Sequence, residues 1–171
     1  MLAKPEPVER HTLSVIVDNE PGVLGRVVGL FSGRGYNIES LTVSETEHDR
    51  HLSRITVVTS GTPSILEQIV AQLGRLVPVH TVVDWSHAGA VVERELALIK
   101  VQGKGESRAE ALRLAEAFRA RVMDATSESF VFELTGKPDK LDQFILLMKP
   151  LGLVEVSRTG IAAISRGAAG L

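Results

Sequence analysis

The sequence has no cysteine in its 171 residues, which excludes disulfides, thiolate nucleophiles and thiolate metal ligands. It also lacks any run of about 20 apolar residues, the length that a membrane-spanning helix needs. Its first ten residues, MLAKPEPVER, are charged and carry two prolines, so they cannot form the apolar core of a signal peptide. These absences lead us to expect a cytoplasmic protein that makes no membrane contact.

The charge of the chain is nearly balanced, at −2 with no long run of one sign. A nucleic-acid-binding protein usually concentrates a basic surplus on one face, so no nucleic-acid partner is expected. Hydrophobic residues make up 44% of the chain and charged residues 23%, a balance that supports a packed core in water. The length suits one domain of ordinary size or two small ones.

The first half of the chain alternates between the apolar patterns of strands and helices. Strands are expected at residues 11–17, 37–45, 52–60 and 77–85, and helices at residues 23–31 and 65–73. Asn19 is a plausible cap for the first helix. Pro21 suits the first turn of that helix, where a backbone N–H would be unpaired in any case.

The second half predicts the same order of elements. Strands are expected at residues 96–101, 122–126, 130–134 and 153–157, and helices at residues 107–118 and 141–148. Parts of the two halves also align without a gap at an offset of 75 residues, so that Gly61 and Pro63 match Gly136 and Pro138. The shared order is the strand–helix–strand–strand–helix–strand pattern of a ferredoxin-like fold. Its recurrence favours two related units.

The expected fold class is therefore α+β, built from two ferredoxin-like (βαββαβ) units. The first unit is expected at residues 11–86 and the second at residues 91–165, with a small polar linker at about residues 86–90. Residues 166–171 have too little apolar surface to pack, so we expect a loose tail.

The sequence offers no constellation of residues for acid–base or nucleophilic catalysis. Its five histidines are scattered along the chain, and its acidic residues are spread over expected helix surfaces and turns. His48 and His51 stand three residues apart in an expected hairpin turn, where a solvated turn is favoured over a metal site without further ligands. We predict no catalytic residue, no metal ligand and no cofactor in this chain.

Glycines gather in the first expected helix. Gly22, Gly25 and Gly29 fall on one side of it, and each costs about 1 kcal/mol of helix propensity relative to alanine. One explanation is that the helix packs tightly on its own sheet. The other is that its first turn receives a small ligand or a second subunit, because unpaired N–H groups and the positive end of the helix dipole suit a carboxylate.

Asn37 stands where the chain leaves this helix for the next strand. It could be a turn asparagine that bonds to its own backbone. It could equally bind the polar end of a ligand, because its amide offers both a donor and an acceptor. The spacing of the residues does not choose between the two.

Two segments resemble a known family. Residues 19–24, NEPGVL, follow a strand and are similar to the amino-acid-binding turn of ACT domains. Residues 34–43, RGYNIESLTV, are similar to a signature of the small regulatory subunits of acetolactate (acetohydroxyacid) synthase. Further similar segments are LSR at 52–54, LEQI at 66–69, VVEREL at 91–96 and SRG at 165–167. The resemblance covers about residues 11–167, nearly the whole chain.

The resemblance implies a homodimer in which two ACT domains pair side by side into one continuous sheet, with valine or a related amino acid at the interface. The ligand-binding residues that it implies are Asn19, Gly22, Val23, Leu24, Asn37 and Ile38. Asn19 and Gly22 would hold the amino-acid backbone of the ligand from one subunit, and Asn37 would come from the partner. The resemblance also implies a catalytic large subunit, which carries the thiamine diphosphate, magnesium and flavin (FAD) of the reaction.

We therefore expect a regulatory subunit for branched-chain amino acid biosynthesis that activates the catalytic subunit and confers feedback inhibition. The alternative is a stand-alone ACT-type sensor that acts on another enzyme or regulator. The second half of the chain, which resembles the small-subunit family in particular, argues against that alternative. Dimerisation is also expected because the apolar stretch 13–17 would be a poor sheet edge to leave unpaired.

Overall fold

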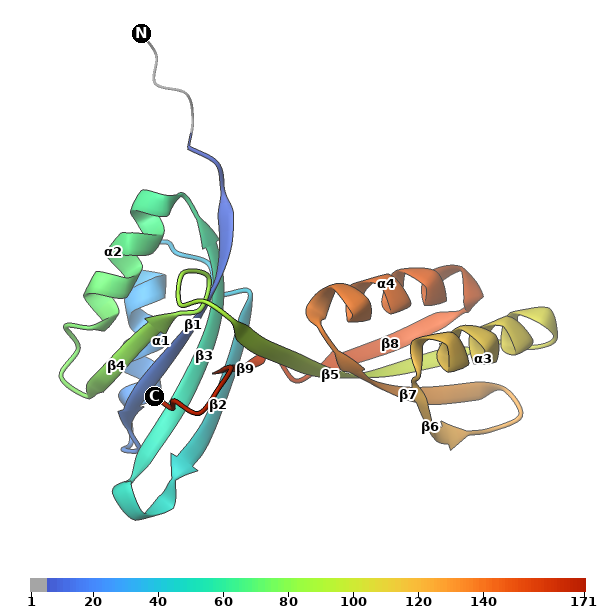
Figure 1. The fold of residues 1–171 in the computed structure, drawn as a ribbon. Coiled ribbons are helices and arrows are strands. Elements are labelled where there is room, and N and C mark those ends of the chain that lie inside the picture. Colours follow the sequence, from blue (N-terminus) through green and yellow to red (C-terminus); the bar gives the residue numbers. More distant parts are fainter. Residues whose placement is uncertain (1–5) are drawn as a thin grey trace, which may run out of the picture. The chain divides into compact units, whose positions relative to one another are not determined.

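The computed structural model describes residues 6–171, apart from the side chains of residues 47 and 48. Its chain forms two compact units, drawn in Figure 1. The first unit comprises the chain up to Val92 together with Ile161–Leu171, and the second comprises Glu93–Gly160. None of the helices in this described part is long and apolar enough to cross a membrane.

The first unit contains an antiparallel sheet with strand order β2-β3-β1-β4. Its strands are β1 (Glu9–Asp18), β2 (Ser40–Glu47), β3 (Leu52–Gly61) and β4 (Val79–Asp84). Helix α1 (Val23–Gly33) follows β1, a short 3-10 turn, η1 (His48–Arg50), follows β2, and helix α2 (Pro63–Leu73) follows β3. Both helices cover the same face of the sheet (Figure 1).

The core of the first unit lies between this face and the two helices. Alternation along β1 sends every second side chain into the core, and the helices bury one apolar stripe each. The buried residues are Leu13, Val15, Val17, Val23, Val27, Phe31, Ile55, Val57, Leu66, Ile69 and Leu73. The apolar residues that alternate along the strands and those that recur at helical spacing therefore pack into one shared core.

The end of the chain covers the opposite face of this sheet. Ile161 and Ala163 are buried there against Val58 and Trp85, and the short strand β9 (Ala162–Ser165) pairs with β5 (Val91–Gln102). From the sequence, residues up to 165 were expected in the second domain, and no strand was expected after residue 157. The contacts group the chain from residue 161 onward with the first unit, because its apolar side chains are buried there.

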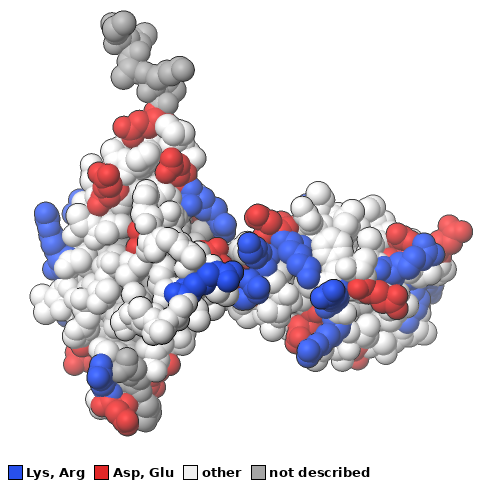
Figure 2. All heavy atoms as spheres, in the orientation of Figure 1, with Lys and Arg blue, Asp and Glu red and all other residues white. Residues whose placement is uncertain are grey.

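The second unit repeats the topology of the first, with strand order β6-β7-β5-β8. Its further elements are α3 (Glu106–Phe118), β6 (Arg121–Ala125), β7 (Ser129–Gly136), α4 (Pro138–Met148), the 3-10 turn η2 (Lys149–Leu151) and β8 (Leu153–Arg158). The predicted class of two ferredoxin-like units is thereby confirmed. On the face shown in Figure 2, positive and negative side chains of this unit are interspersed.

The two units also share local features at the 75-residue offset. Helices α2 and α4 each begin with a proline, Pro63 and Pro138. A glycine, Gly61 or Gly136, stands two residues before each proline. A Cβ added to either glycine would lie 3.1 Å from a side chain of the following helix. This close approach of the strand end to the following helix explains why the same glycine and proline occur in both halves.

The sheet order corrects one argument from the sequence. Strand β1 is central, because it pairs with β3 on one side and β4 on the other. The apolar stretch 13–17 is therefore not an exposed edge, and the edges of this sheet are β2 and β4. The start of β2 was also wrong, since the strand begins at Ser40 and Asn37 lies before it.

Candidate functional site

Helix α1 begins after a type II turn. The N–H of Val23 donates to the carbonyl of Glu20 at 3.3 Å, and Gly22, the third residue of the turn, has φ 85° and ψ −8°. That position requires a positive φ and favours glycine, whereas the second position favours proline, here Pro21. The Pro-Gly pair thus explains how the chain enters the helix. The prediction that Asn19 caps the helix and that Pro21 lies in its first turn was wrong.

The first turn of α1 presents backbone donors to solvent. The N–H of Arg26 donates to the carbonyl of Gly22 at 3.1 Å, and no side chain caps the helix. Among residues 6–171, the N–H groups of Leu24 and Gly25 have no acceptor. Both of these residues are exposed. Unpaired N–H groups beside the positive end of the helix dipole provide a site that suits a carboxylate.

The glycines of α1 face away from the sheet. A Cβ added to Gly25 or Gly29 would meet no atom within 4 Å. The residues that α1 buries are Val23, Val27 and Phe31. Tight packing of the glycines on their own sheet is therefore ruled out. Because each glycine costs about 1 kcal/mol of helix propensity, this open strip favours contact with something outside the unit.

The six predicted ligand-binding residues fall at two ends of α1. Residues 19–24 lie at its start, whereas Asn37 and Ile38 lie just beyond its end. The helix has 11 residues, which corresponds to a length of about 16 Å at 1.5 Å per residue. A small amino acid cannot span that distance. The six residues therefore form two separate groups within one chain.

The six residues also differ in how they are presented. Val23 is only 5% exposed and packs in the core, whereas Leu24 is 41% exposed. Ile38 is half-buried against the same core. Asn37 is exposed, and its carbonyl accepts a hydrogen bond from Thr59 Oγ1 at 2.6 Å. Within the described part of the chain its side-chain amide makes no hydrogen bond, which leaves both amide atoms available to a ligand.

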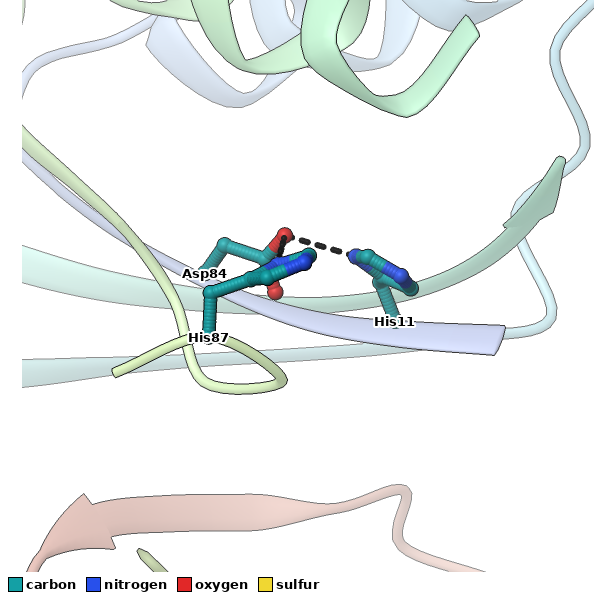
Figure 3. Close-up of side chains that lie close together, drawn as sticks. All are labelled: His11, Asp84 and His87. Atoms are coloured by element: carbon teal, nitrogen blue, oxygen red, sulfur yellow. Dashed lines mark hydrogen bonds and ion pairs between the residues drawn. The ribbon is translucent and has the colours of Figure 1, made fainter. Parts of the chain in front are cut away.

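A second polar cluster lies in the first unit and was not predicted from the sequence. The Oδ2 atom of Asp84 lies 2.6 Å from Nδ1 of His11 and 3.2 Å from Nδ1 of His87 (Figure 3). Its Oδ1 atom accepts a hydrogen bond from the N–H of Ser86 at 3.0 Å. Burial raises the pKa of Asp84, but the hydrogen bonds from His11, Ser86 and His87 outweigh it and hold the pKa below its ordinary value.

The spacing of these residues explains why they were missed. His11 precedes Asp84 by 73 residues, so only the pairing of β1 with β4 brings them together. The one local signal is an aspartate followed by a histidine three residues later at a strand end. The histidine pair that was considered, at residues 48 and 51, is not tested, because the side chain of residue 48 lies outside the described residues.

Known families match both halves of the chain. Residues 13–81 match the family described as the AHAS small subunit-like ACT domain. Residues 94–167 match the family described as the small subunit of acetolactate synthase. The two matches together extend over most of the chain and coincide with the two ferredoxin-like patterns.

Curated relatives and a solved structure agree with these matches. A probable acetolactate synthase small subunit of Archaeoglobus fulgidus is 47% identical over 158 residues, which are 92% of this chain and 98% of that protein. The isozyme 3 small subunit of Escherichia coli is 46% identical over 92% of this chain and 96% of its own. A crystal structure of the acetolactate synthase small subunit from Thermotoga maritima superposes with a TM-score of 0.82 at 38% identity, covering 94% of this chain and 99% of that one.

Proposed function

The chain belongs to the family of acetolactate synthase small subunits, and from that premise we propose that it activates a catalytic subunit and makes it sensitive to valine or a related amino acid. It is a regulatory subunit of a catalytic complex rather than a catalyst. The observation that carries the finer proposal is the division of the predicted ligand-binding residues between the two ends of α1. This division calls for a second copy of the chain.

Two half-sites at opposite ends of one helix are completed when two copies pair about a two-fold axis. Antiparallel apposition of two α1 helices places the start of one beside the end of the other. Strand β2 is a terminal strand of the sheet, and its Val43 is 44% exposed. Pairing of β2 with its copy would extend the sheet and cover that edge. Each dimer would then hold two equivalent ligand sites.

The chemistry of each half-site suits one part of an amino acid. The N–H groups of Leu24 and Gly25 would receive the carboxylate, and the amide oxygen of the partner's Asn37 would accept from the ammonium group. Leu24 and the partner's Ile38 supply apolar surface for an aliphatic side chain. Full burial of a valine side chain contributes about 1.5–3 kcal/mol, so the apolar contact adds selectivity to the polar ones.

The location of the ligand supplies a route for feedback. A ligand shifts a conformational equilibrium only by its difference in affinity for the two states. Because the proposed site is complete only in the dimer, valine would favour the paired arrangement, by about 2.7 kcal/mol at a concentration of 100 times its Kd. The catalytic subunit, which we propose holds the thiamine diphosphate, magnesium and FAD, would respond to that change.

Reconstitution tests the proposal. The purified chain is mixed with the catalytic subunit and all cofactors, and acetolactate formation is measured with and without valine, leucine or isoleucine. We expect no product from the chain alone, a higher rate from the mixture, and a lower rate when the effector is added. A catalytic rate unchanged by saturating amounts of the chain contradicts the proposal. If the chain then still binds valine in calorimetry, the stand-alone sensor is the better explanation.

A further inference from the structure

His11 lies in strand β1, and Asp84 and His87 lie at the end of β4 and in the turn after it; the three side chains converge below helix α2. Figure 3 shows both imidazole rings directed at the carboxylate of Asp84. Their ligand atoms all lie within 4.8 Å of one another, and among the described residues this is the group that could hold a metal ion. We propose that these three side chains bind one divalent transition-metal ion of the zinc class, a site separate from the half-sites of α1.

The donor set defines the class of metal. Two imidazole nitrogens and one carboxylate oxygen suit Zn²⁺, Co²⁺ or Ni²⁺, whereas Mg²⁺ and Ca²⁺ prefer sites made of oxygen alone. Three protein ligands with a fourth position open to solvent or a small molecule form a common zinc arrangement. His11 Nδ1, Asp84 Oδ2 and His87 Nδ1 provide these three ligands.

The groups around the cluster hold two of the ligands in position. Nε2 of His11, the ring nitrogen away from Asp84, lies 3.2 Å from Oε2 of Glu9. The N–H of Ser86 fixes Oδ1 of Asp84 at 3.0 Å and leaves Oδ2 facing the rings. A carboxylate behind a ligating histidine, and a hydrogen bond behind a ligating carboxylate, are the usual outer-shell partners of bound metals.

The required rearrangement is small. Zinc bonds of about 2.0–2.1 Å in a tetrahedral site separate the ligand atoms by roughly 3.3 Å. The distance from His87 Nδ1 to Asp84 Oδ2 is already 3.2 Å, and that from His11 Nδ1 is 2.6 Å. His11 is buried, whereas the side chain of His87 is 73% exposed on a turn. His87 is already near the spacing that the ion needs, and His11 Nδ1 and Asp84 Oδ2 would have to move apart by about 0.7 Å.

The open position would face a hollow. A cavity of about 390 Å³ adjoins the cluster and is lined by Leu66, Val70 and Ala71 of α2, and also by Glu67 of the same helix. Water or a small ligand could reach the ion there. The ion would tie strand β1 to the turn after β4. This role requires neither valine nor the catalytic subunit, so it stands or falls independently of the proposed function.

Metal titration of the untagged, full-length chain tests the proposal. The chain is freed of metal with a chelator and titrated with Co²⁺, followed by visible absorption, and with Zn²⁺, followed by calorimetry. We expect one ion per chain, a Kd in the micromolar range or below, and no competition from Mg²⁺.

Three variants locate the ion. His87→Ala and Asp84→Asn should weaken Zn²⁺ binding by about tenfold or more, and the exposed His87 can change without loss of the fold. His80→Ala is the matched control, because His80 also pairs with an aspartate, Asp18 at 2.6 Å, but lacks a second histidine; its affinity should stay unchanged. The absence of saturable binding at one ion per chain overturns the proposal. Equal Zn²⁺ affinity of the His87→Ala and His80→Ala variants also overturns the proposal. The three side chains would then form a hydrogen-bonded cluster that binds no metal.

Discussion

The turn before α1 offers a direct test of carboxylate recognition, because Gly22 can be replaced by two side chains of similar size and different charge. The φ angle of Gly22 is 85°, so either side chain enters an unfavourable backbone region, at a cost of about 1–2 kcal/mol. No atom lies within 4 Å of an added Cβ, so no steric clash adds to this cost. We expect Gly22→Asp and Gly22→Asn to lower the free energy of unfolding by similar amounts.

The charge should separate the two variants in ligand binding. Two unit charges about 4 Å apart repel by roughly 4 kcal/mol at an effective dielectric constant of 20. Gly22 is exposed, and salt and solvent screen part of that repulsion. A remainder of about 1.4 kcal/mol still corresponds to a tenfold loss of affinity. The aspartate variant should therefore bind valine at least about tenfold more weakly than the asparagine variant.

The assay is inhibition of the reconstituted enzyme by valine, with activation measured in parallel. Gly22→Asp should lose inhibition and keep activation, whereas Gly22→Asn should keep a measurable part of both. Inhibition of Gly22→Asp at the wild-type valine concentration would refute the reasoning. Equal loss in both variants would show that the geometry of the turn matters, and the charge of the ligand does not.

Three further changes probe the interface, the electrostatics and the second core. Gly29→Ala should raise the intrinsic stability of α1 by up to about 1 kcal/mol but weaken the dimer. Light scattering at micromolar concentration should report a dimer for the wild type and a weaker one for the variant; an unaffected dimer would exclude the glycine face of α1 from the interface. The pKa of Glu39 is lowered by a hydrogen bond from Ser60 and then by Arg10, against the opposing effect of burial. Its stabilisation is therefore present above about pH 4.5 and decreases as the pH falls through the lowered pKa. Glu39→Gln should be less stable than wild type at pH 7 by less than about 1 kcal/mol, and this difference should shrink in acid in urea unfolding; a difference that grows in acid would contradict this. Phe144, which is 0% exposed, should cost about 3–5 kcal/mol when changed to alanine, and a cost below 1 kcal/mol in the same assay would count against the assigned core.

Local periodicity predicted the fold because each element buries one face. The alternation of Leu13, Val15 and Val17 and the proline at the start of α2 were sufficient to place those elements. The order of the strands in the sheet depends on pairings between residues far apart in sequence, so the central position of β1 could not be predicted from its composition. Strand β9 was missed because only Ile161 and Ala163 bury there, too short a pattern to recognise.

The candidate site was predictable to the extent that its signals are local. Gly22 and Asn37 stood out, and the resemblance to ACT domains implied that both bind a ligand. The Pro21-Gly22 pair was assigned to the helix although it is typical of a type II turn. The cluster of His11, Asp84 and His87 had no comparable local pattern, because the residues meet only through the sheet.

The duplicated topology separates the role of the first unit from that of the second. Helix α3 occupies the place in the second unit that α1 has in the first, but the sequence ESRAEALRLAEAF contains no glycine. Its Arg108 lies over the ring of Phe130 at 3.8 Å, and it follows Gly105 at φ 60° and ψ −127°, which is not the geometry of a type II turn. The type II turn and the glycine strip of α1 are therefore absent from α3, although α3 also begins without a side-chain cap. This difference favours one amino-acid site per chain, formed by the first unit, with the second unit free to serve another contact.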